Sequence, residues 1–168
     1  MIFPFKQIAY WIREVRLLRE SRTVAKYRDY VLTKLKTPEN IAWWVEQTIF
    51  YDRFEHPLRW NDIASTLRKK KGNCTELSCV ARYGMNLLNS YLAMNFCVYG
   101  TDKDGVNRGH AVCAFTHFNR KGYMEAGHVN YYPDNTSWET IAKKVRPDWT
   151  DISTGWKDDQ GKNIVGLP

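Results

Sequence analysis

The chain has 168 residues, of which 43% are hydrophobic and 14% aromatic, and its formal net charge is +7. This apolar content excludes an intrinsically disordered chain, and the length is typical of one domain. No segment approaches the roughly 20 apolar residues of a membrane-spanning helix, and charges interrupt the N-terminus where a secretory signal would be apolar. We therefore expect a single soluble domain, residues 1–168, in the cytoplasm.

A basic helical extension is predicted over residues 1–36. Residues 1–37 contain nine Lys and Arg against three Asp and Glu, which is most of the excess positive charge. A solvated helix face explains this pattern, and the alternatives are an acidic partner, an anionic membrane surface or a nucleic acid. No nucleic-acid-binding motif is present, which argues against the last. Apolar side chains recur near helical spacing and predict packing against the domain, led by Ile8, Trp11, Val15 and Leu18.

A core of helices followed by strands is predicted over residues 38–145. Thr37-Pro38 begins a helix that runs to residue 51, and Asn61 caps a short helix over residues 62–69. After Gly72 a further helix begins near Asn73. Its apolar positions continue to residue 88.

The second half of this core changes from helical to strand-like periodicity. The predicted strands cover residues 94–99, 109–116 and 123–127, separated by turns at 102–105 and 119–122. A short helix is predicted at 137–144, and residues 147–168 lack periodicity and are expected to form an irregular tail. Helices followed by an antiparallel sheet make an α+β fold.

Four cysteines are present, and one of them occupies a position that favours a thiolate. Cys74 lies in the first turn of the helix that follows Gly72, where unpaired N–H groups and the helix dipole stabilise a negative sulfur. Cys79 is rotated by about 140° on the same helix and is expected in the core. Cys97 and Cys113 lie in apolar strands. The competing interpretation of Cys74 is a buried, unreactive side chain.

The spacing of the cysteines argues against a metal or disulfide framework. The chain has no C-x-x-C pair, and Cys113 and His117 would lie about 13 Å apart along one strand. We expect free thiols in a reducing compartment, with no metal and no cofactor.

A thiolate nucleophile needs a base, and His110 is the favoured candidate among four histidines. It lies at the beginning of the predicted strand over 109–116, where a strand end can meet a helix end. His117 lies at the other end of that strand with opposite parity, so at most one of the two serves the site with Cys74.

Five segments together resemble the nucleophile, histidine and acid regions of the transglutaminase-like superfamily. They are residues 48–52 (TIFYD), 60–67 (WNDIASTL), 71–78 (KGNCTELS), 109–112 (GHAV) and 123–127 (YMEAG). The likeness covers roughly residues 38–145 and is nearest to the bacterial transglutaminase-like cysteine proteinases. It implies a papain-like fold, with the nucleophile at a helix N-terminus packed on a small antiparallel sheet, and a Cys-His-Asp triad.

The third member of the implied triad does not map directly. Glu125 lies fifteen residues after His110, near the place where the family has aspartate. Asn130 is a second candidate, because a tight turn at 119–121 would pair His110 with residues 129–131 and an amide can orient a histidine. Asp134 is a third. We select Cys74, His110 and Glu125 as the candidate catalytic residues.

The resemblance implies a cysteine peptidase, amidase or transglutaminase-like acyltransferase with a protein or peptide substrate. Hydrolysis and acyl transfer differ only in the nucleophile that resolves the thioester, so both stay open. The alternative is a catalytically degenerate domain that acts as a binding or structural module, which the departure at the aspartate position would fit.

Overall fold

The computed structural model describes residues 22–52, 62–125 and 127–164. Ile8, Trp11, Val15 and Leu18, and the proposed cap Asn61, lie outside these ranges. No helix within the described part of the chain is long and apolar enough to cross a membrane.

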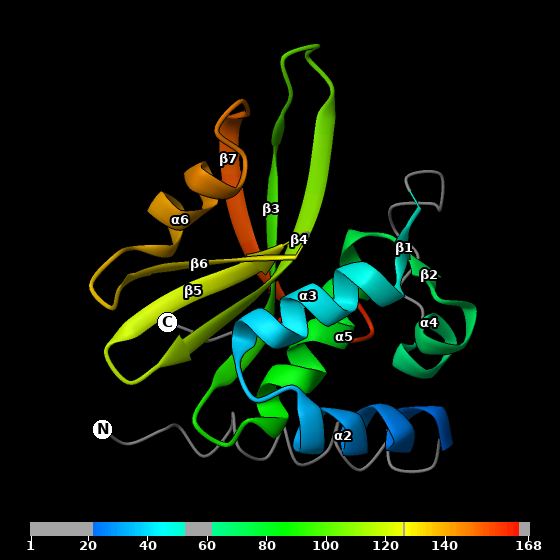
Figure 1. The fold of residues 1–168 in the computed structure, drawn as a ribbon. Helices are drawn as coiled ribbons and strands as arrows, with labels where there is room; N and C mark the ends of the chain where they lie inside the picture. Colours follow the sequence, from blue (N-terminus) through cyan, green and yellow to red (C-terminus); the bar gives the residue numbers. More distant parts are fainter. Residues whose placement is uncertain (1–21, 53–61, 126, 165–168) are drawn as a thin grey trace.

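Five helices, a five-stranded antiparallel sheet and a two-stranded parallel pair form the described structure, so the α+β class is confirmed (Figure 1). The sheet has the order β6-β5-β4-β3-β7. Its strands are β3 (Leu92–Thr101), β4 (Asn107–His117), β5 (Arg120–Glu125), β6 (His128–Pro133) and β7 (Thr150–Lys157). The helices are α2 (Arg22–Lys34), α3 (Pro38–Thr48), α4 (Ile63–Lys69), α5 (Cys74–Leu87) and α6 (Trp138–Val145).

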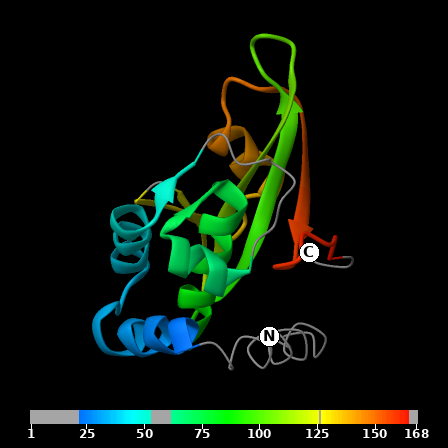
Figure 2. The same ribbon diagram turned by 90° about the vertical axis from the view of Figure 1, so that its right-hand side faces the viewer.

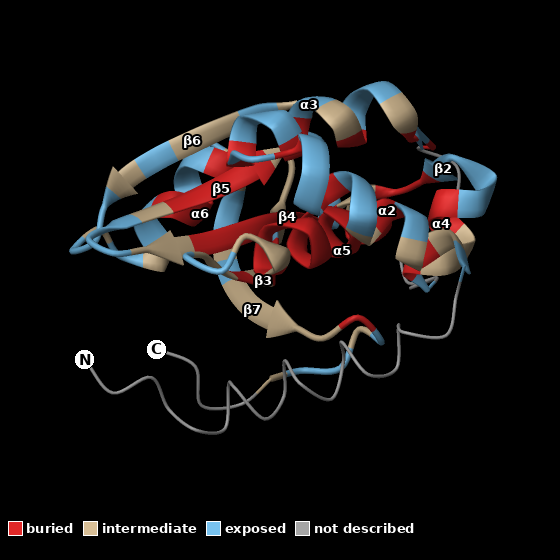
Figure 3. Ribbon diagram, turned by 60° about the horizontal axis from the view of Figure 1, so that its bottom comes forward, coloured by how far each residue is buried: buried red, intermediate tan, exposed pale blue. Residues whose placement is uncertain are grey.

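Helices cover both faces of this sheet (Figures 1 and 2). On one face α5 packs against β3 and β4, and α2, α3 and α4 pack around α5 in turn. Figure 3 shows that α5 is almost wholly buried, whereas α2 and α3 expose their outer sides. On the other face α6 covers a second apolar cluster that includes Phe96, Val112 and Ile141. Strand alternation accounts for the two clusters, because successive residues of β3 and β4 face opposite sides.

Several helix starts follow the chemistry of their caps. Thr37 accepts a hydrogen bond from the backbone N–H of Asn40 and Pro38 follows it, as predicted. The cap of α4 is Asp62, one residue later than the predicted Asn61. Asp62 accepts from the backbone N–H of Ser65 at 2.6 Å.

The C-terminal segment corrects the predicted irregular tail. Residues 150–157 form β7, which pairs antiparallel with β3 from Asn95↔Lys157 to Thr101↔Thr150. Trp156 lies against Phe96, with ring centroids 4.8 Å apart. Every residue of β7 is exposed or only half-buried, so its polar, glycine-containing sequence does not alternate between apolar and polar positions. Without that alternation the sequence does not predict a strand. The sequence does not predict β6 for the same reason.

Candidate active site

The start of α5 is fixed by a reciprocal capping box around Asn73. The Asn73 Oδ1 accepts hydrogen bonds from the backbone N–H groups of Thr75 and Glu76, at 3.0 and 3.2 Å. The Glu76 carboxylate in turn accepts from the backbone N–H of Asn73 at 2.8 Å. All three side chains are buried. Cys74 is therefore the first residue of a helix whose N-terminus is rigidly defined.

A two-stranded parallel pair holds the approach to this helix. β1 (Phe50–Tyr51) pairs with β2 (Lys71–Gly72), and the N–H of Asp52 donates to the carbonyl of Gly72 at 2.9 Å. A Cβ at Gly72 would lie only 2.9 Å from the Cβ and a carboxylate oxygen of Glu76. Glycine at this position thus allows β2 to run against the capping box.

The histidine lies on a part of β4 that has no partner on one side. The register of β4 with β5 ends at Cys113↔Met124, whereas β4 itself begins at Asn107. His110 therefore occupies an open strand edge. Alternation places His110 and Glu125 on the face covered by α6, and Cys74 meets them around this edge from the opposite face.

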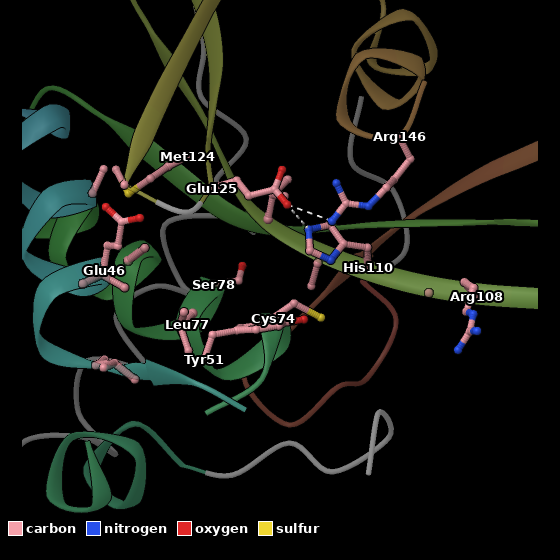
Figure 4. A pocket seen from close by; sticks show the side chains of 18 of the residues that line it. Glu46, Tyr51, Cys74, Leu77, Ser78, Arg108, His110, Met124, Glu125 and Arg146 are labelled. Atoms are coloured by element: carbon pink, nitrogen blue, oxygen red, sulfur yellow. Dashed lines mark hydrogen bonds and ion pairs between the residues drawn. The ribbon is translucent and has the colours of Figure 1, made fainter. Parts of the chain in front are cut away.

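The structure brings Cys74, His110 and Glu125 together in one pocket (Figure 4). The His110 Nε2 lies 2.6 Å from the Glu125 Oε1, and the two side chains are 9% and 26% exposed. This contact is an ion pair when His110 is protonated, but its angle is not that of a hydrogen bond, since Nε2 has no hydrogen-bond partner of good geometry within the described structure. The Cys74 thiol lies in the same pocket near this imidazole (Figure 4).

These contacts oppose the effect of burial on all three groups. Burial alone would raise the pKa of Cys74, but His110 and the backbone N–H groups of Ala111 and Thr75 lower it below the ordinary value of 9.0. Burial would lower the pKa of His110, but Cys74 and Glu125 raise it above 6.5. Burial would raise the pKa of Glu125, but His110 and Arg146 lower it below 4.5. A thiolate and an imidazolium therefore stabilise each other here.

The other candidates for the third position lie elsewhere. Asn130 is on β6 and pairs with Tyr123, and Asp134 follows β6, where its N–H donates to Asn119 at the β4–β5 turn. The predicted pairing of His110 with residues 129–131 is wrong. The hairpin register joins His117 to Arg120, which shifts every partner by three residues from the predicted turn.

The remaining cysteines are buried and unlike Cys74. Cys79, Cys97 and Cys113 are at most 3% exposed, and the four cysteines are free thiols. Burial raises the pKa of Cys97 to about 11 and that of Cys113 to about 12. Cys79 accepts a hydrogen bond from Asn95 in the core, in agreement with its predicted inward position.

Two contributors to the site were not predicted from the sequence. The backbone N–H of Ala111 helps to lower the pKa of Cys74, and Arg146 donates a hydrogen bond to the Glu125 Oε1 at 2.8 Å. Arg146 lies one residue beyond the predicted core, in a connection with no periodicity. A basic residue at a helix C-terminus is also ordinary in any helix, so nothing marked it.

The pocket has a volume of about 780 Å³ and two kinds of wall. An apolar wall lies between α3 and α5 and includes Val45, Leu77 and Ala81. A polar wall comes from the β3–β4 turn, the first residues of β4 and the α6–β7 connection, and it includes Asp102, Arg108 and Arg146. Within the described residues, no group of three or more His, Cys, Asp or Glu side chains is arranged to hold a metal ion.

No protein-family model matches the chain, and no curated protein matches it in sequence.

Proposed function

We propose that the protein is a cysteine hydrolase or acyltransferase that acts on an amide or peptide bond. The observation that carries this proposal is the placement of Cys74, His110 and Glu125 in one pocket, with the His110 Nε2 2.6 Å from the Glu125 Oε1. The resemblance of the surrounding segments to the transglutaminase-like superfamily supports the same chemistry. In this proposal Glu125 takes the place of the family's aspartate.

The first half of the reaction forms a thioester. The Cys74 thiolate attacks the carbonyl carbon, a C–S bond forms, and the carbonyl oxygen becomes an oxyanion. The backbone N–H of Cys74, at the N-terminus of α5, is placed to stabilise that oxygen. His110 then donates its proton to the leaving nitrogen, the C–N bond breaks, and the amine departs.

The second half releases the acyl group. Neutral His110 takes a proton from water or from an acceptor amine, which attacks the thioester carbon. The C–S bond then breaks, the thiolate is restored, and the product is an acid or a new amide. Throughout, Glu125 orients the ring through Nε2, which leaves Nδ1 for the thiol and the substrate.

The apolar wall indicates what lies next to the scissile bond. Cys74 is followed on α5 by Leu77, Ser78 and Ala81, which line the pocket together with Val45 of α3. An acyl group with an aliphatic side chain fits this wall, because binding removes the apolar surfaces of both the side chain and the wall from water. We therefore place the acyl part of the substrate, and not its leaving amine, on the α3 side of the pocket.

A library of peptide amides tests the proposal, with hydrolysis and incorporation of a fluorescent amine measured in parallel. The expected result is turnover by the native protein, no turnover by Cys74→Ser, and retained turnover by Cys79→Ala, which removes a buried thiol outside the pocket. Rapid alkylation of Cys74 without turnover of any amide would favour the degenerate binding module.

A further inference from the structure

Arg146 joins the candidate triad to the end of α6. Its Nη2 donates to the Glu125 Oε1 at 2.8 Å, and that same oxygen lies 2.6 Å from the His110 Nε2. A single carboxylate oxygen is thus shared between the imidazole and the guanidinium. Figure 4 shows both contacts converging on Glu125.

The guanidinium is itself held at two further points. Its Nη1 donates to the backbone carbonyl of Val145 at 2.7 Å, and its Cζ lies 5.7 Å from the ring centre of Trp149. Arg146 is the residue that ends α6, and its own N–H donates to the carbonyl of Ala142. The planar group therefore has a fixed place relative to α6 before it meets Glu125.

We propose that Arg146 is a positioning residue for the reaction: it holds the Glu125 carboxylate beside the His110 Nε2. This inference rests on the proposed function. Glutamate has one more rotatable bond than aspartate, so a glutamate in this role needs a second contact to hold it. Glu125 is 26% exposed, and packing alone leaves its carboxylate partly free to turn toward solvent.

A second effect of the arginine acts in the opposite direction. The carboxylate of Glu125 favours the imidazolium form of His110, and a cation beside that carboxylate weakens its effect. A purely electrostatic role of the arginine would therefore lower the activity. Removing the cation would then leave more of the carboxylate's charge for His110. The two effects predict opposite changes in rate, which makes positioning testable.

The experiment compares Arg146→Met and Arg146→Lys with the native protein, measuring the rate constant for alkylation of Cys74 across pH and the rate of amide turnover. Arg120→Met serves as the control, because Arg120 is an exposed arginine at the β4–β5 turn, away from the pocket. We expect Arg146→Met to lose about 10- to 100-fold in turnover, as misalignment of a catalytic group does, and Arg146→Lys to recover part of it. Arg120→Met should match the native protein.

A double-mutant cycle with Glu125→Gln separates positioning from general stability. If Arg146 acts through Glu125, Arg146→Met causes little further loss when Glu125 is already glutamine. A native or faster rate in Arg146→Met, or an equal loss in the Glu125→Gln background, would overturn the inference. If the native protein turns over no amide, the pH midpoint of Cys74 alkylation tests the positioning role of Arg146. A midpoint unchanged in Arg146→Met then refutes positioning, and one shifted upward supports it while the proposed function fails.

Discussion

Replacing Asn73 by alanine should both destabilise the protein and weaken the Cys74 thiolate. Asn73 is 4% exposed, and its Oδ1 accepts three hydrogen bonds, from two backbone N–H groups and the Thr75 hydroxyl. Alanine leaves these donors buried without that acceptor. An N-cap replacement costs about 0.5–2 kcal/mol, and burial places this one near the upper end, at about 2 kcal/mol. For a chain of this size the melting temperature should fall by about 4–8 °C.

The same substitution tests the link between the cap and the site. A frayed first turn would release the N–H groups that stabilise the sulfur, so alkylation of Cys74 near neutral pH should slow. Asn73→Ser is the matched control, since serine is an equally good cap and should retain most of the stability. Thermal unfolding and iodoacetamide kinetics measure the two effects. An unchanged melting temperature in Asn73→Ala would refute the claim that the capping box determines this end of α5.

Three further results are expected. Iodoacetamide near neutral pH should modify Cys74 well before the other cysteines, because those are at most 3% exposed and burial raises the pKa of Cys97 and Cys113; peptide mapping that finds Cys79, Cys97 or Cys113 modified first would contradict this. Amide turnover should follow a bell-shaped pH profile, rising through the lowered pKa of Cys74 and falling through the raised pKa of His110 as the imidazolium loses its proton; a rate that keeps rising to the ordinary thiol pKa of 9.0 would argue against the pair. Asp159→Ala should lower the free energy of unfolding in urea by about 3–5 kcal/mol, because Asp159 is 8% exposed and pairs with buried Arg82. A loss below about 1 kcal/mol would mean that the pair contributes little.

The ion pair at the site also makes folding stability depend on pH. A histidine with a raised pKa stabilises the fold fully below its ordinary pKa of 6.5, and this contribution is lost as pH rises through the folded value. Cys74 and Glu125 have lowered pKa values, so each stabilises the fold above its ordinary pKa and loses that contribution as pH falls through the folded value. For Glu125 that loss lies below pH 4.5.

The first half of the fold was predictable because its signals are local. Thr37-Pro38 and Asn73 are caps whose side chains satisfy backbone N–H groups within three residues, so the sequence alone marks them. The cysteine at the start of α5 follows from the same reasoning. The β4–β5 register was not predictable, since Phe118 adopts a left-handed conformation with φ of 50° at the turn, and no glycine marks that position.

The remainder of the site depends on contacts between distant segments. Arg146 contacts Glu125, 21 residues away in sequence, and β7 forms the edge of the sheet beside β3 although its own sequence does not alternate. Register and edge order arise from packing of the whole sheet, which a local pattern does not encode.

A thiolate–imidazolium pair of Cys74 and His110 is tested most directly by a pH titration of the Cys74 thiolate, followed by its ultraviolet absorbance. Difference spectra against Cys74→Ser isolate the signal of this one cysteine, and His110→Ala removes its partner. We expect a midpoint below the ordinary thiol value of 9.0 in the native protein and a higher midpoint in His110→Ala. A midpoint at or above 9.0 that is the same in both proteins would contradict the pair.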